Sequence, residues 1–231
     1  FRSWRRPPPK LPPCWIFSGK AAAASFAELP SQIDVMALIQ GQWAGFDEVG
    51  RGCLAGSVIA AAVILPEDCC IQGLTDSKKL SPKKREDLAL LIREQAIACA
   101  IGRAEPSEID HINILKASLL AMERAFQGLC VKPPGALIDG NRAPFLPVET
   151  RTLIGGDRLE PAISAASILA KVARDFEMVL ADQLFPGYHF GVHKGYPTPE
   201  HQNALQRLGP SPIHRKSFGP VRAWINQGPT P

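Results

Sequence analysis

The sequence predicts an α/β domain in which helices flank a mixed central sheet and further helices follow at the C-terminal end. Three strand-like segments come first, and helical and strand-like segments alternate after them, which is the order typical of a mixed sheet. The longest uncharged apolar stretch, Val58 to Leu65, has the length of a strand and is far shorter than a membrane span. At 231 residues the chain is long enough to bury a sizeable core.

The strands are expected where short apolar runs end at turn residues. In chain order they are Trp43–Val49, Ser57–Leu65, Ala96–Gly102, Ala136–Asp139 and Arg151–Ile154. The glycine-rich turn Gly50–Gly56 joins the first two strands, so this pair is expected to form a hairpin.

The helices are expected where apolar residues recur every three or four positions, or where a capping residue precedes proline. Ser81 is a suitable N-cap, and Pro82 a suitable first residue, for a helix that runs to about Gln95. The remaining helices are expected over Pro106–Gln127, Pro161–Leu184, Pro199–Leu208 and Val221–Ile225.

Residues 1–40 differ in composition from the rest of the chain. They contain two proline runs and the alanine run Ala21–Ala24, which predicts a disordered Pro/Arg/Ala-rich N-terminal extension. An arginine-rich start without acids is also typical of an organellar transit peptide, which is the alternative. One folded domain is expected over residues 41–228.

The cysteines and the charge favour no particular function. The six cysteines form no C-x-x-C pair and no spacing suited to zinc, so we expect reduced thiols in a cytoplasmic, monomeric protein that does not span a membrane. The formal charge is +4, but residues 1–27 carry five basic residues and no acid. The remaining residues are near neutral, so a surface that binds phosphates has to be local.

The acids that stand out lie at the ends of predicted strands. Asp47 and Glu48 interrupt an apolar strand, Asp139 ends another, and Asp157 follows a third. A buried carboxylate is costly unless it is paired or binds a metal, and strand ends can converge at one edge of an α/β sheet. A cluster that offers only oxygen ligands suits Mg²⁺ or Mn²⁺ better than zinc.

Each acid also has an ordinary interpretation when taken alone. An aspartate before glycine at a strand end is commonly a turn residue. Glu48 follows Asp47 directly, so in a regular strand the two side chains point to opposite faces and Glu48 is a solvated residue. Both reach one metal pair only if the strand bends or if Glu48 lies near the sheet edge.

Several motifs, in the same order along residues 42–225, resemble ribonuclease HII. The matching segments are Gly45–Gly52 with Leu54–Gly56, Thr75–Ser81, Leu137–Asn141, Gly156-Asp157, Ile163–Val172 with Arg174-Asp175, and His193–Thr198 with His201. The sequence departs from the family pattern at Ser57, where proline is usual, and in the first forty residues, which have no counterpart.

The resemblance implies a ribonuclease H-like fold and an endoribonuclease that hydrolyses the RNA strand of RNA–DNA hybrids. It also implies cleavage on the 5′ side of a single ribonucleotide embedded in duplex DNA, which leaves 3′-hydroxyl and 5′-phosphate ends. The metal-binding catalytic acids are then Asp47, Glu48, Asp139 and Asp157, with Mn²⁺ or Mg²⁺ as the cofactor. Two such ions can stabilise the attacking and leaving oxygens of an in-line displacement.

The resemblance also assigns residues to substrate binding. The turn Gly50, Arg51, Gly52 contacts the 2′-hydroxyl in the family, and glycine permits a close approach of backbone to substrate. Tyr196 resembles the family tyrosine that stacks on the sugar after the junction. The candidate phosphate contacts are Arg51, Lys78, Lys79, Lys171 and Lys194. Taken alone, these residues are a hairpin turn, a loop aromatic and solvated charges.

Three other functions compete with this interpretation. The related ribonuclease HIII carries an additional N-terminal domain, for which forty proline- and alanine-rich residues are too few. A non-catalytic hybrid-binding module of the same fold is the main alternative, although the presence of all four acids argues against it. A glycosidase would need a groove rich in aromatic residues, and the chain has two tyrosines and four tryptophans.

A zinc site at His189 and His193 would need a helix that Gly187, Gly191 and Gly195 disfavour.

Overall fold

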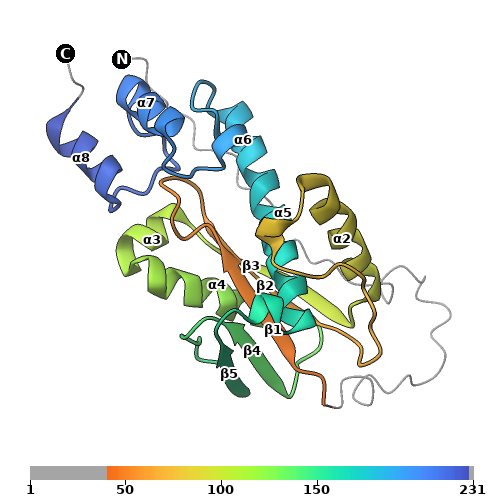
Figure 1. Cartoon of the computed structure of the whole chain (residues 1–231). Coiled ribbons are helices and arrows are strands. Elements are labelled where there is room, and N and C mark those ends of the chain that lie inside the picture. Colours follow the sequence, from red (N-terminus) through yellow and green to blue (C-terminus); the bar gives the residue numbers. More distant parts are fainter. Residues whose placement is uncertain (1–40, 229–231) are drawn as a thin grey trace, which may run out of the picture.

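The computed structural model describes residues 41–228. These residues form a domain built on a five-stranded sheet with the strand order β3-β2-β1-β4-β5 (Figure 1). Its strands are β1 (Ala44–Val49), β2 (Val58–Ile64), β3 (Ala98–Ala104), β4 (Gly135–Asp139) and β5 (Glu149–Leu153). The pairs β1–β2 and β2–β3 are antiparallel, whereas β1–β4 and β4–β5 are parallel. The predicted mixed sheet and the predicted first hairpin are therefore confirmed, while the predicted disordered extension lies outside the described residues.

Strand β2 is buried on both faces, and its alternating side chains belong to two cores. Val58, Ala60, Ala62 and Ile64 pack in a core with α4 (Ile114–Gly128). Ile59, Ala61 and Val63 pack in a second core with α2 (Pro82–Gln95) and α5 (Pro161–Leu184). Helices therefore cover both faces of the sheet (Figure 1), as a strand with apolar residues at every position requires.

Two sequence predictions need correction. The helix predicted over Pro106–Gln127 is two helices, α3 (Pro106–Ile112) and α4, because Asn113 between them adopts φ 70° and its side chain caps α4 by accepting from the Lys116 N–H. Asparagine tolerates the left-handed region and favours N-caps, so it ends one helix and begins the next. Strand β3 begins at Ala98, two residues later than predicted, because the Ala96 N–H still donates to Ile92 O of α2.

Helix α5 lies directly against β1, the strand that carries Asp47 and Glu48. A Cβ at Gly45 would lie 2.2 Å from the backbone carbon of Ala162 in α5, so only glycine permits this approach. The close contact places the small residues of α5, among them Ser164 and Ser167, beside the carboxyl ends of the strands. The packing of α5 therefore supports the edge of the sheet at which the acids lie.

The C-terminal segment, residues 185–228, contains α6 (Phe190–His193), α7 (Pro199–Leu208) and α8 (Gly219–Gln227). Its core forms around Met178 of α5, with Phe185, Tyr188, Phe190 and Ala204. The sequence did not predict α6, which is one turn long and lies between His189 and Lys194, both at positive φ. Within residues 41–228, no helix is long and apolar enough to cross a membrane.

Candidate active site

The parallel pairing of β1 and β4 brings two of the predicted acids to the same end of the sheet. The register pairs Phe46 with Ile138, so Asp47 and Asp139 are the next residues of neighbouring strands. Both strands run in the same direction, and their carboxyl ends therefore meet at one edge. This is the edge at which α/β sheets place their sites.

Asp47 is almost fully buried, with 9% of its surface exposed. One carboxylate oxygen accepts the Glu48 N–H at 2.7 Å, and the Ser167 side chain of α5 acts to lower the pKa of Asp47. Burial is the largest cause that raises the pKa of Asp47, to about 7, and the neighbouring charges of Glu48 and Asp139 raise it further. Asp47 is therefore a buried carboxylate whose charge lacks a sufficient counter-charge.

Glu48 shares the same electrostatic environment although it follows Asp47 directly in the strand. Burial raises the pKa of Glu48, the ion pair with Arg51 lowers it, and the charge of Asp139 raises it. In the ion pair, Arg51 Nη1 lies 3.0 Å from Glu48 Oε1. Asp139 therefore acts on both Asp47 and Glu48, and Glu48 lies one residue before the end of β1.

Asp157 lies in a short 3₁₀ helix, η3 (Gly156–Arg158), just after β5. The Gly156 N–H donates to Asp139 Oδ1 at 2.8 Å, and the Ser164 hydroxyl donates to Asp157 O at 2.6 Å, so η3 is fixed between β4 and α5. Burial raises the pKa of Asp157, and the charges of Asp76 and Asp139 raise it further. All four predicted acids thus belong to one electrostatic cluster, the acid edge: Asp47, Glu48, Asp139 and Asp157.

The acid edge fits divalent cations by its chemistry. Its donors are all carboxylate oxygens, the kind of ligand that Mg²⁺ and Mn²⁺ prefer. Among residues 41–228, no three His, Cys, Asp or Glu side chains already lie close enough together to hold a metal ion. Mutual repulsion opposes such closeness, and one oxygen of Glu48 is taken by the cationic Arg51. Cations would supply the counter-charge that these acids lack.

The predicted substrate-binding turn lies next to the acid edge and is fastened to the C-terminal segment. Leu54 N donates to Gly195 O at 2.8 Å, and Arg215 N donates to Leu54 O at 2.8 Å. The first contact brings Tyr196 beside the turn, where Cys53 acts electrostatically on the Tyr196 hydroxyl. Arg51 and Gly52 are exposed on the turn, and Tyr196 lies beside the turn although it is far from it in sequence, whereas Gly50 is buried.

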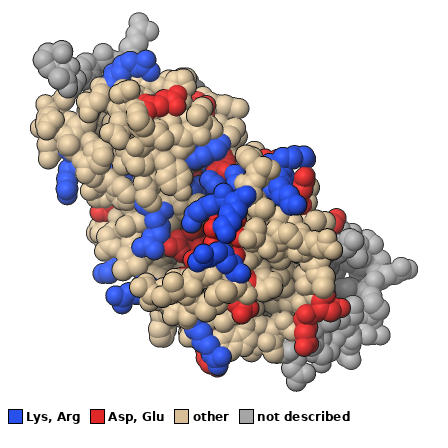
Figure 2. Space-filling model, in the orientation of Figure 1, with Lys and Arg blue, Asp and Glu red and all other residues tan. Residues whose placement is uncertain are grey.

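The predicted lysines divide between two places. The charge of Lys78 lowers the pKa of Asp157, which places Lys78 beside the acid edge. Lys171 pairs with Asp175 at 2.7 Å and lies 6.0 Å from the ring of Tyr196, and burial lowers the pKa of Lys194 in the same neighbourhood. Lys79 follows Lys78 in the short helix Ser77–Lys79. Figure 2 shows basic side chains gathered around a red acidic area near the middle of the face drawn.

A chain of buried histidines supports the loop that carries Tyr196. Ser211 N donates to His214 Nδ1 at 2.9 Å, so the other nitrogen of neutral His214 carries the proton and donates to His201 Nε2 at 3.0 Å. His201 Nδ1 then donates to Tyr196 O at 2.9 Å. Burial lowers the pKa of His201, and lowers that of His214 to about 3, in agreement with neutral rings.

The sequence prediction missed five residues that act on this site. They are Asp76 beside Asp157, Ser167 on Asp47, His214 behind Tyr196, and the buried Arg174 and Arg215 beneath the turn. The signal for Ser167 is a hydroxyl three residues after Ser164 in an otherwise apolar helix face. Arg215 gave no such signal, because its acceptors lie more than 150 residues away in the chain. His214 gave none either, because its role depends on the packing that brings it to His201.

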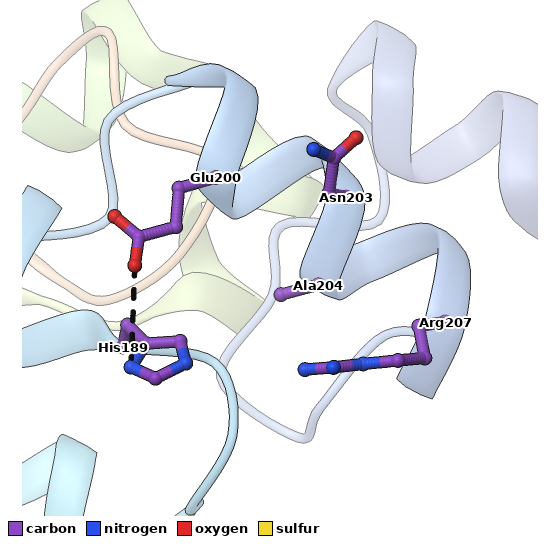
Figure 3. A pocket seen from close by; sticks show the side chains of 5 residues that line it. All are labelled: His189, Glu200, Asn203, Ala204 and Arg207. Carbon is purple, nitrogen blue, oxygen red and sulfur yellow. Dashed lines mark ion pairs between the residues drawn. The ribbon is translucent and has the colours of Figure 1, made fainter.

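A hollow of about 450 Å³ on the C-terminal segment is separate from these residues (Figure 3). His189, Glu200, Asn203, Ala204 and Arg207 line it, and His189 Nδ1 lies 4.0 Å from Glu200 Oε1. His193, in contrast, is buried and bonded to Tyr188 O. None of the predicted site residues lines this hollow, so we do not include it in the candidate active site.

A mixed sheet with carboxylates at its strand ends and basic side chains around them is typical of metal-dependent nucleases. A family model described as Ribonuclease HII matches residues 44–221, and the chain belongs to this family. It is 57% identical over 182 residues to a ribonuclease HII of Nitrosococcus oceani, an alignment that covers 79% of this chain and 90% of that protein. The chain is accordingly a metal-dependent endoribonuclease of the ribonuclease H class, which acts on RNA–DNA hybrids.

Solved structures of similar proteins share the fold. The crystal structure of ribonuclease H2 from Pyrococcus horikoshii OT3 matches with a TM-score of 0.66 and 25% identity, covering 80% of this chain and 98% of that one. The crystal structure of Bst-RNase HIII in complex with Mn²⁺ matches with a TM-score of 0.64 and 16% identity, covering 89% of this chain and 76% of that one. The predicted ribonuclease H-like fold is thereby confirmed.

Proposed function

We propose that the chain cuts a duplex on the 5′ side of a single embedded ribonucleotide, as well as the RNA strand of longer hybrids. The products are a 3′-hydroxyl end and a 5′-phosphate end. The single observation that carries the proposal is the junction of the acid edge with the turn Gly50–Gly52, which continues directly from the strand of Asp47 and Glu48. Chemistry and ribose recognition then lie within a few residues of each other.

Asp47, Glu48, Asp139 and Asp157 are the residues that would hold two divalent cations, Mg²⁺ or Mn²⁺. When bound, the cations supply charge stabilisation to the attacking and leaving oxygens of an in-line phosphoryl displacement. Burial, together with the repulsion between neighbouring acids, raises the pKa of Asp47 and Glu48, and this supports the assignment because a bound cation would stabilise the charged carboxylates. The structure of Bst-RNase HIII with Mn²⁺ supports manganese as one of the metals.

The chain's own residues position the substrate. Arg51 and Gly52 are exposed at the tip of the turn, where their backbone can contact the 2′-hydroxyl that distinguishes RNA from DNA. Tyr196, with 37% of its surface exposed, offers a ring face beside the turn for the sugar that follows the junction. Lys78 on one side, and Lys171 and Lys194 on the other, can contact phosphates and fix the register of the duplex.

The experiment is cleavage of a duplex that holds one ribonucleotide, with an all-DNA duplex of the same sequence as the control. We expect one cut on the 5′ side of the ribonucleotide with Mg²⁺ or Mn²⁺, no cut in chelator and no cut of the control. Cutting that persists in chelator would contradict the metal mechanism. Tight binding without any cut would favour the non-catalytic module.

A further inference from the structure

Two arginine side chains are buried beneath the turn that we propose reads the ribose. Arg215 has 0% and Arg174 has 1% of its surface exposed, and they are the largest fully buried side chains of the described residues. Neither guanidinium forms an ion pair within residues 41–228. Burial of an unpaired charge is costly, so each group has to be compensated by hydrogen bonds.

Backbone carbonyls of the turn compensate Arg215. Arg215 Nη2 donates to Gly50 O at 2.7 Å, Nη1 donates to Arg51 O at 2.9 Å, and Nε donates to Gly56 O at 2.9 Å. These three bonds use both ends of the turn, and two of them involve residues of the motif itself. A planar guanidinium with several donors fixes such a set of acceptors in a way that a lysine ammonium does not.

The bonds to Gly50 O and Arg51 O determine where the amides of the turn point. In a trans peptide the C=O and N–H groups point in opposite directions. Because the Gly50 and Arg51 carbonyls point inward to Arg215, the N–H groups of Arg51 and Gly52 point outward. Within residues 41–228 neither N–H has an acceptor, and both residues are exposed. Two unpaired donors are therefore presented at the surface beside the acid edge.

Arg174 provides a natural comparison, because it is equally buried and also donates to three carbonyls. Its acceptors are Ser57 O at 2.8 Å, Ala55 O at 3.1 Å and Lys194 O at 3.0 Å. None of these peptides carries the N–H of Arg51 or Gly52. Arg174 thus hydrogen-bonds the outgoing end of the turn and packs beside Gly50, whereas Arg215 hydrogen-bonds the Gly50 and Arg51 carbonyls and so orients the tip.

We propose that Arg215 is a positioning residue for ribose recognition, which orients the Arg51 and Gly52 amides toward the 2′-hydroxyl and the adjoining phosphate. The inference rests on the proposed function, since it assigns the cause of a preference that the proposed function requires. It adds a residue of the C-terminal segment that touches neither metal ligand nor substrate.

The test compares Arg215→Lys with Arg174→Lys, each in an Asp139→Asn background that prevents turnover in Mg²⁺. The readout is the ratio of affinities for a duplex with one ribonucleotide and for an all-DNA duplex of the same sequence. We expect Arg215→Lys to reduce this ratio about tenfold, the effect of one or two lost hydrogen bonds. Arg174→Lys should lower the melting temperature about as much as Arg215→Lys does, but it should leave the affinity ratio unchanged.

Each outcome decides the question. A ratio retained in Arg215→Lys, or lost equally in both variants, would overturn the inference and leave the proposed function standing. If the protein with native Arg215 bound the ribonucleotide duplex and the all-DNA duplex equally well, the proposed function itself would be overturned. If Arg215→Lys does not fold, amide NMR of the Asp139→Asn protein is the test. The Arg51 and Gly52 amide signals should shift when the ribonucleotide duplex is added and should not shift when the all-DNA duplex is added. Equal shifts with both duplexes would contradict the inference.

Discussion

The acid edge and the C-terminal segment hold buried charge in opposite ways. At the acid edge, burial and then the charges of neighbouring carboxylates raise the pKa of Asp47, Glu48 and Asp157, and that of Asp47 reaches about 7. Beneath the turn, the charge of Arg215 is surrounded by three backbone carbonyls, and burial with Arg174 nearby lowers its pKa to about 10 without neutralising it at physiological pH. The counter-charges at the acid edge, such as Arg51 on Glu48, do not offset the burial of Asp47, whereas Arg215 is compensated within the chain.

This difference separates chemistry from recognition. The acid edge needs cations to become a stable arrangement, so its function depends on a ligand from outside the chain. The turn and the Tyr196 loop are held by hydrogen bonds that the folded chain already makes. We therefore expect changes at the acid edge to abolish turnover and changes in the C-terminal segment to alter stability and substrate preference.

The largest effect is expected for Asp139→Asn. The asparagine keeps an oxygen that can accept the Gly156 N–H, so the fold is retained while the charge is lost. Metal-supplied stabilisation amounts to several kcal/mol, so kcat should fall by about 1,000-fold. Single-turnover cleavage and a binding assay measure this. Glu149→Gln, an exposed acid of β5, is the control and should stay within about twofold of wild type.

The second effect separates the two glycines of the turn. Gly50 has φ 92°, and a Cβ there would lie 2.4 Å from Arg174 Nε, so Gly50→Ala should cost about 3 kcal/mol of unfolding free energy. Gly52 has no atom within 4 Å of such a Cβ, so Gly52→Ala should cost less than about 1 kcal/mol. Urea denaturation compares them. Equal losses would show that Arg174 does not constrain the turn.

The third effect is that His214 lowers the stability of the folded chain in acid. Its folded pKa of about 3 lies below its ordinary value of 6.5, so the unfolded chain binds more protons. This stabilisation is present above pH 6.5 and is lost as the pH falls toward 3, by about 2 kcal/mol between pH 7 and pH 5.

Unfolding measured at both pH values checks the contribution of His214. The pH dependence should be smaller by that amount in His214→Gln. It should be unchanged in His189→Asn, since His189 is exposed and has a positive φ that asparagine tolerates. A His214→Gln protein with the pH dependence of wild type would contradict the neutral, buried histidine chain.

The smallest effect is a change of preference in Tyr196→Ala. Loss of a ring contact worth about 1 kcal/mol should reduce kcat/KM about fivefold more on a single ribonucleotide than on a long hybrid. Tyr196→Phe keeps the ring and should keep the preference. Equal damage on both substrates would indicate that Tyr196 supports the loop alone.

The sequence predicted the acid edge because its signals are local. A carboxylate inside an apolar run is visible at Asp47 and Asp139, and the period of the strands is visible at β2. Asn113 is also a local signal, because asparagine favours the N-cap position at which the predicted helix divides into α3 and α4.

The support of the turn could not be predicted in the same way. Arg215 donates to Gly50 O from 165 residues away, and an arginine in a sequence is ordinarily a solvated charge. His214 is likewise defined by its partner His201 and by burial, neither of which its neighbours in sequence indicate. The roles of Arg215 and His214 therefore depend on which groups the fold brings together, and they can be assigned only from the structure.

The most direct test of the separation between chemistry and recognition uses the wild-type chain in chelator. Affinities are measured for a duplex with one ribonucleotide and for an all-DNA duplex of the same sequence, and cleavage is followed in the same samples. We predict that the preference for the ribonucleotide duplex persists while cleavage is absent, and that added Mg²⁺ restores cleavage. A preference that disappears with the metal would contradict this prediction, because recognition would then depend on the acid edge and not on the turn.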